Sequence, residues 1–279
     1  MDFTIETYNK LLGILQNKGF VFQSFVGFIQ KPGKKVIILR HDVDKLPENS
    51  LTIARLESSL GVRGSYYFRT VPSGYNEEII RNVAELGHEI GYHYETMDTV
   101  SKKIKDKSKK TKVKDYDLLI DAAYEEFCRN LEMLRKIVPI ETVCMHGSPL
   151  SKYDNRAIWG KYDYKKSGII AEPYIDIDFN QVFYITDTGR MWDGDNVTIR
   201  DKPLHRITTQ WPTYHSTFDI IKALNEDTFP NITMMTFHPQ RWSDKPIPWM
   251  TELVWQNLKN AGKYFLVKWR DKEEVGSRK

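Results

Sequence analysis

Apolar residues along the chain follow two alternating patterns, short unbroken runs and longer stretches with helical spacing. The clearest run, Val36 to Leu39, lies between Gly33 and Pro47 and leads into Arg40 and two acids. An unbroken apolar run of this length is typical of a strand buried on both faces, as in a parallel sheet covered by helices. With this strand taken as 36–40, similar runs predict strands at 65–68, 89–92, 142–145, 167–171, 181–186, 231–237 and 264–268.

Stretches of helical spacing separate these runs. They predict helices at 4–17, 48–60, 76–86, 117–137, 218–224 and 250–261. Phe20, Phe22 and Phe25 predict a short edge strand or a plug over one barrel end. Strands that alternate with helices favour a parallel sheet. Because no linker rich in Gly or Ser interrupts these units, we expect one α/β domain over 1–279, a closed or nearly closed barrel in which 1–30 form an N-terminal extension.

Composition excludes several classes of protein. A hydrophobic content of 41% and an aromatic content of 13% are typical of a globular protein, and two cysteines are too few for a disulfide framework. We expect no membrane span and no secretion signal, and therefore a cytoplasmic location. The net charge of +4 comes from 101–114, which hold eight lysines and one aspartate and leave −3 for the remainder. We therefore expect a solvated lysine-rich loop there, or a rim that attracts anions, and no nucleic-acid partner.

Candidate chemistry gathers where the predicted strands end. Four of the seven histidines follow or end four different strands, namely His41, His93, His146 and His238. Asp42 and Asp44 follow the first of these strands. The carboxyl ends of barrel strands meet at one face, where such folds place their chemistry. Imidazole together with carboxylate is the ligand set of zinc and related divalent metals, so the pattern predicts a metal site.

At these residues the sequence resembles the polysaccharide deacetylase superfamily of carbohydrate esterases. The resemblance lies in Asp42-Val43-Asp44, in Gly87-His88-Glu89-Ile90-Gly91-Tyr92-His93, and in Met234-Met235-Thr236-Phe237-His238-Pro239. It extends from Val36 to Pro239. It implies a distorted (β/α)7-type TIM-like barrel and a metal-dependent hydrolase that removes an N-acetyl or related acyl group from a sugar. The form of the motifs is nearest to deacetylase-like proteins of surface-polysaccharide clusters.

The resemblance also implies roles for individual residues. Asp42 corresponds to the general base, Asp44 and His93 to metal ligands, and His238 to the general acid. The family's second ligand histidine falls at Met97, a poor ligand for such a cation.

For the missing ligand, His146 is the first candidate, because it emerges from the neighbouring strand. Glu95 is the second, and a site without metal is the remaining alternative. The sequence His146-Gly147-Ser148-Pro149 also lacks the arginine that partners the base in the family.

Other polar residues have both structural and functional interpretations. His41 points to the opposite strand face from Asp42, which favours a role in the core, and His88 is expected to be structural. The polar segment 187–195 is interpreted either as an ordinary barrel loop or as a sugar-binding lid. In the second case Trp192 would pack on a ring and Arg190 would bind a carboxylate or phosphate.

Three functions stay open from the sequence. The first is a sugar deacetylase with a divalent metal, most simply zinc, and a carbohydrate substrate. The second is another C–N amide hydrolase of the same superfamily. A glycosidase is disfavoured because Asp42 and Asp44 on one strand could not straddle a sugar. The third is a catalytically inactive carbohydrate-binding barrel.

Overall fold

The central strand of the molecule is β2 (Val36–Val43), and every one of its eight residues is buried. A computed structural model describes residues 1–107, 116–147, 151–193 and 211–276. In it, β2 runs parallel to β3 (Ser65–Phe68) on one side and to β7 (Ile232–Phe237) on the other. β1 (Val21–Gln23) pairs with the start of β2. The apolar run thus forms the buried centre of a parallel sheet, as its composition predicts.

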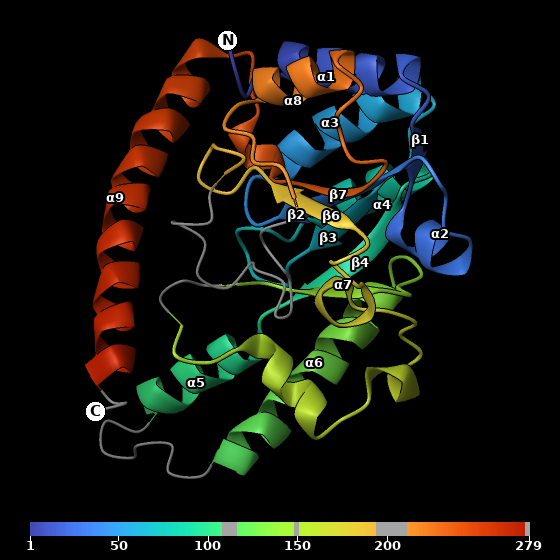
Figure 1. Ribbon diagram of the computed structural model, residues 1–279. Helices are drawn as coiled ribbons and strands as arrows, with labels where there is room; N and C mark the ends of the chain where they lie inside the picture. Colours follow the sequence, from blue (N-terminus) through green and yellow to red (C-terminus); the bar gives the residue numbers. More distant parts are fainter. Residues whose placement is uncertain (108–115, 148–150, 194–210, 277–279) are drawn as a thin grey trace.

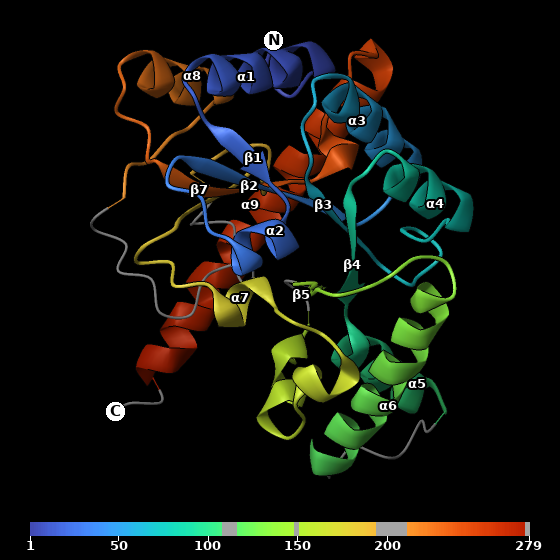
Figure 2. The same cartoon turned by 90° about the vertical axis from the view of Figure 1, so that its right-hand side faces the viewer.

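The other strands extend this sheet at both edges. They are β4 (Glu89–Tyr94), β5 (Val143–Met145) and β6 (Phe183–Thr186). The strand order is β5-β4-β3-β2-β7-β6, with β1 beside β2. The sheet curls into a parallel half-barrel surrounded by helices, which is the architecture of a distorted TIM-like barrel (Figures 1 and 2).

Helices connect most of these strands. The α-helices are α1 (Ile5–Asn17), α2 (Phe25–Gln30), α3 (Pro47–Ser59), α4 (Glu77–Glu85), α5 (Thr96–Lys107), α6 (Tyr116–Arg135), α7 (Pro173–Asp176), α8 (Thr217–Asn225) and α9 (Pro246–Gly276). Short 3-10 helices are η1 (Asn155–Gly160), η2 (Tyr164–Ser167) and η5 (Pro239–Arg241). In Figure 1, α1, α3 and α8 lie together above the sheet, whereas α5 and α6 lie below it.

The barrel is open between β5 and β6. Within the described residues no strand pairing joins these two edges, and a single bridge between Thr142 and Ala171 is all that forms at the β5 edge. The strand predicted at 167–171 is therefore wrong, because that segment is occupied by the end of η2 and this bridge. The chain then passes through α7 before it enters β6.

Two other predicted elements are wrong. Residues 264–268, predicted as a strand, belong to α9. A short aromatic and apolar run fits both the strand period and the helix period. Extending an existing helix by a few residues costs much less free energy than starting a new one. The lysine-rich segment was expected to be a loop, but its first part, 101–107, continues α5. The remainder of that segment lies outside the described residues. α2 was not predicted either.

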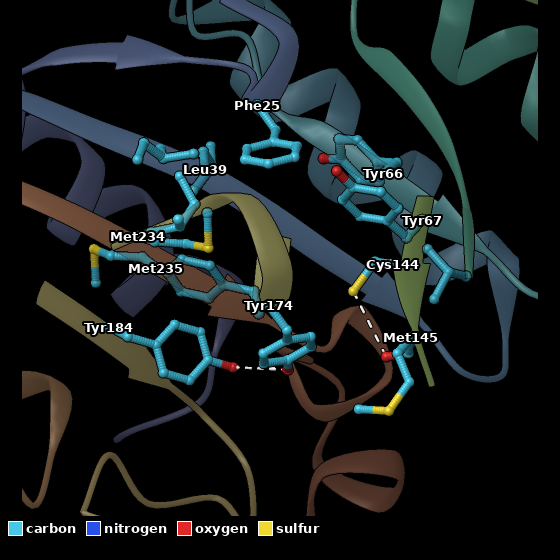
Figure 3. Close-up of a cluster of buried hydrophobic side chains, with 14 of the residues drawn as sticks. Phe25, Leu39, Tyr66, Tyr67, Cys144, Met145, Tyr174, Tyr184, Met234 and Met235 are labelled. Carbon is cyan, nitrogen blue, oxygen red and sulfur yellow. Dashed lines mark hydrogen bonds between the residues drawn. The ribbon is translucent and has the colours of Figure 1, made fainter. Parts of the chain in front are cut away.

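The interior of the half-barrel is filled by aromatic and sulfur-containing side chains. Figure 3 shows Tyr67, Cys144, Tyr174 and Met234 among this buried cluster. The ring of Tyr67 crosses Gly91, where an added Cβ would lie 2.3 Å from the Tyr67 Cε1 atom. Only glycine leaves room for this contact, which explains one glycine of the second motif.

A charged network is buried between the sheet and its covering helices. The Glu57 carboxylate of α3 lies 2.8 Å from His41 Nε2 and 3.5 Å from His88 Nδ1. It accepts a hydrogen bond from Tyr66 at 2.7 Å and another from Tyr8. His41 therefore faces the helices and not the barrel interior, as its position in the strand predicts, and His88 belongs to the same structural network.

This network should contribute strongly to stability. Burial alone would raise the pKa of Glu57, but the contact with His41 outweighs it and lowers that pKa. A lowered pKa stabilises the fold near neutral pH, and the contribution is lost as the pH falls through the lowered value. We expect Glu57→Gln to lower the free energy of unfolding by about 3 kcal/mol at pH 7, since it leaves buried partners unpaired.

Urea unfolding of the parent protein and of Glu57→Gln measures this difference in unfolding free energy. Glu48→Gln changes an exposed carboxylate on the same helix and is the matched control, with an expected cost of at most about 1 kcal/mol. Equal losses of unfolding free energy in Glu57→Gln and Glu48→Gln would contradict the stabilising role of the Glu57 network.

The last helix, α9, runs along one side of the molecule (Figure 1). Its inward positions are polar, since Asn260 donates to Gly189 O at 2.8 Å and Gln256 donates to Asn260 at 3.0 Å. Its outward positions include exposed apolar side chains, namely Ile247, Met250, Val254, Trp255 and Leu258. Among the described residues, no helix combines the length and the apolar character needed to cross a bilayer.

Candidate metal centre

β2 delivers two carboxylates to the mouth of the half-barrel. Side chains alternate along a strand, so Arg40 and Asp42 share the interior face while His41 takes the other. Asp44 follows directly, and its backbone N–H donates to Asp42 O at 3.1 Å, which turns the chain at the strand end. The paired acids predicted from the sequence therefore lie at the carboxyl end of the central strand.

Two histidines from the neighbouring strands approach the second of these acids. His93, on β4, has its Nε2 atom 3.5 Å from Asp44 Oδ1. His146, just after β5, has its Nε2 atom 3.4 Å from the same oxygen. One ligand atom from each of these three residues lies within 4.8 Å of the other two. The structure thus brings together Asp44, His93 and His146, the three metal ligands that the sequence predicts.

The remaining ring nitrogens are occupied by groups behind the cluster. His93 Nδ1 lies 3.0 Å from Cys144 O, and His146 Nδ1 lies 3.3 Å from Glu95 Oε2. The carbonyl behind His93 Nδ1 fixes the tautomer that leaves Nε2 as a ligand, whereas the contact of His146 Nδ1 with Glu95 is an ion-pair contact without hydrogen-bond geometry. Glu95, the second candidate for the missing ligand, lies behind His146. Met97 is buried in the core.

Glu95 is itself held in place by an arginine. Arg69 donates to both Glu95 oxygens, at 2.8 and 2.7 Å, and to Asp44 O at 2.8 Å. Burial would raise the pKa of Glu95, but its contacts with His146 and Arg69 lower it to about 2. The carboxylate behind His146 is thus ionised at all ordinary pH values.

The three residues fit a divalent cation. Asp44 Oδ1 is buried and has no hydrogen-bond partner among the described residues, an arrangement that is costly unless a cation satisfies it. Two imidazole nitrogens and one carboxylate are a catalytic zinc ligand set. A second group, Asp42, His93 and Cys144, also lies within 4.8 Å. It fits less well, because a guanidinium covers both oxygens of Asp42.

That guanidinium belongs to Arg40. Its Nε and Nη2 atoms donate to the two Asp42 oxygens at 2.8 and 2.6 Å, and the Arg40 side chain is fully buried. Burial would raise the pKa of Asp42, but Arg40 and His93 outweigh it and hold this pKa below its usual value. The segment 146–149 provides no arginine partner for Asp42. Arg40 of β2 provides one.

His238 reaches the cluster from the end of β7. Its Nε2 atom lies 3.8 Å from Asp44 Oδ2, and its Nδ1 atom lies 2.6 Å from Asp187 Oδ1. Asp187 also accepts from Arg241 Nη1 at 2.8 Å and from Trp242 Nε1 at 2.7 Å. Burial would raise the pKa of Asp187, but Arg241 and His238 lower it. Asp187 is an ionised carboxylate that orients the imidazole.

Arg190 and Trp192, predicted as substrate contacts, are not brought to this cluster. Trp192 is 5% exposed, and its ring packs on Phe237 with centroids 5.3 Å apart. Arg190 is 8% exposed and lies over the rings of Phe3 and Trp249. Both side chains are packed into the protein, so the interpretation as a sugar-binding lid is corrected for these two residues. The rest of that segment, from residue 194, lies outside the described residues.

Of the other two histidines, only His215 lies within the described residues, and it does not belong to the cluster. His215 is exposed and lies 2.9 Å from Asp193 Oδ2. His205 lies outside the described residues.

Comparison with known proteins gives a distant structural likeness. No family model matches this sequence, and no curated protein matches it. Among solved structures, the chain is similar to a family 4 carbohydrate esterase from Bacillus anthracis, with a TM-score of 0.37 and 10% sequence identity over 91% of this chain and 86% of that chain. The roles of the site residues therefore rest on their own geometry.

Proposed function

We propose that this protein is a hydrolase that removes an N-acetyl or related acyl group from a sugar with the help of a divalent cation, zinc being the first choice. The observation that carries the proposal is the three-ligand cluster of Asp44, His93 and His146. An arginine-bound carboxylate, Asp42, and a carboxylate-bound imidazole, His238, lie beside it. The form of the motifs favours a precursor of a surface polysaccharide as the substrate.

Asp44, His93 and His146 would hold the cation. A cation bound there supplies Lewis acidity toward a carbonyl oxygen and makes water more acidic. The Cys144 carbonyl keeps His93 Nε2 directed at the cluster, and Glu95 lies behind His146. All these contacts come from residues of the sheet and the turns that follow its strands, which is how a ligand set is kept in place.

Asp42 would accept the proton of the attacking water. Its lowered pKa keeps it ionised, and its two hydrogen bonds to Arg40 fix its orientation. His238 would donate a proton from Nε2 to the departing amine nitrogen. Asp187 accepts a hydrogen bond from the Nδ1–H group of His238 and stabilises the charged imidazole before that transfer.

The proposal is tested first by metal content. We expect Asp44→Asn, His93→Gln and His146→Gln each to lose at least about tenfold in metal affinity, because each removes one of three protein ligands. His215→Gln, which changes an exposed histidine, is the matched control and should keep its metal. The measurement is metal analysis after dialysis against a graded series of chelator concentrations.

The second test is acetate release from N-acetyl sugars by the zinc- or cobalt-loaded protein. Release that depends on the same three residues would support the hydrolase. If none of the three substitutions changed the metal content, the cluster would not be the metal site and the proposal would fail.

A further inference from the structure

A pocket opens directly beside the proposed metal site. It has a volume of about 270 Å³, and Asp44 and His146 form part of its wall. The rest of the wall carries four cationic side chains: Lys45, Arg69, Arg241 and Lys259. Whatever group of the substrate extends from the reacting centre into this pocket meets an unusual density of positive charge.

Three of these cations are already paired with carboxylates. Arg69 pairs with Glu95, and Arg241 pairs with Asp187, as described above. Lys45 Nζ lies 3.0 Å from Glu252 Oε2, on α9.

Lys259, also on α9, is different. Within the described part of the chain, no carboxylate lies within ion-pair distance of its ammonium group, which rests 5.4 Å from the centre of the Trp255 ring.

The balance of charge changes when the metal site is filled. Besides Asp44, the acids around the pocket each have a basic partner. Glu252 and Asp44 both act on Lys259, but Glu252 is paired with Lys45, and Asp44 is the only carboxylate among the three proposed ligands. A divalent cation outweighs its single negative charge, so the loaded site and Lys259 together leave an excess of about two positive charges. Such an excess favours an anion in the pocket.

We propose that this pocket binds an anionic substituent of the substrate, a phosphate or a carboxylate, through Lys259 with Lys45 beside it. The inference rests on the proposed function, because it places this substituent next to the acyl-sugar bond that the site would hydrolyse. The neighbours of Lys259 are consistent with this role. Partial burial, followed by the charge of Lys45, lowers the pKa of Lys259, and the negative charge of a bound anion would favour its charged form.

The experiment compares three probes bound to the zinc-loaded protein by calorimetry. They are N-acetylglucosamine, its 1-phosphate and N-acetylmuramic acid, which are neutral, phosphorylated and carboxylated. We expect at least one anionic probe to bind about tenfold more tightly than the neutral one, as a charge-assisted contact should provide. The two anionic arms distinguish phosphate from carboxylate recognition.

Substitutions then show whether the lysine is responsible. We expect Lys259→Met to abolish most of this preference and Lys259→Arg to retain it, with unchanged zinc content in both. Lys10→Met alters an exposed lysine of α1 that does not line the pocket and should leave the preference intact. Because all measurements are of binding, they do not depend on turnover.

Two results would overturn the inference. One is equal affinity for neutral and anionic probes. The other is a preference that survives in Lys259→Met, which would mean that the metal ion alone attracts the anion. Failure of acetate release with an intact, Lys259-dependent preference would instead contradict the proposed hydrolase.

Discussion

Replacing Asp42 by asparagine is expected to lower kcat for acetate release by about a thousandfold, within the range that removal of a general base produces. Asparagine has nearly the same shape, but its neutral amide cannot accept the proton of the attacking water. The zinc content should stay that of the parent, since Asp42 is not among the three proposed ligands. A steady-state assay combined with metal analysis separates this outcome from simple loss of the cation.

The substitution has a structural side effect that must be measured separately. Arg40 is fully buried and loses its charged partner, which should destabilise the fold by about 3 kcal/mol. The double variant Arg40→Met/Asp42→Asn removes both charges and should regain much of that stability while staying inactive. An Asp42→Asn protein whose kcat stays within tenfold of the parent would exclude Asp42 as the general base.

Much of the sheet could be predicted because its strands are buried on both faces. Val36 to Leu39 and Met234 to Phe237 have no polar alternation to obscure them, and turn residues bound them on either side. One of the errors falls where the apolar pattern suits two periods. The run 264–268 has too few residues for its own periodicity to distinguish strand from helix, and the decision comes from the helix that precedes it.

The candidate ligands could also be predicted, for a topological reason. Parallel strands end at one edge of a sheet, so His93, His146 and Asp44 had to approach one another if the strand assignments were right. The choice of His146 over Glu95 follows the same reasoning, because the histidine emerges from the next strand whereas Glu95 lies behind it.

Arg40 and Asp187 were missed for different reasons. Arg40 had a usable signal, since an arginine two residues before an acid on a strand shares its face. Asp187 follows the strand predicted at 181–186, but the sequence does not reveal that this strand pairs with the one that leads to His238. Trp192 was misplaced because the sequence of a loop does not reveal whether its aromatic side chain turns inward or outward.

The hydrogen bond between His238 and Asp187 leads to the second large effect. We expect Asp187→Asn to lower kcat by about a hundredfold or more, the usual scale for general acid catalysis, with a smaller change in KM. The amide cannot stabilise a charged imidazole, and its NH₂ group can point at His238 Nδ1 and impose the wrong tautomer.

The chain provides a matched control in a second pair of the same type. His215 is exposed, Asp193 is half-buried and the two lie 2.9 Å apart, so Asp193→Asn makes the same chemical change at a pair outside the proposed site. It should leave kcat as it is. Because Asp187 also binds Arg241 and Trp242, the folded fraction and the zinc content of its variant must be shown to match the parent. A folded, zinc-loaded Asp187→Asn protein with a kcat within threefold of the parent would exclude Asp187 as the group that positions His238 for catalysis.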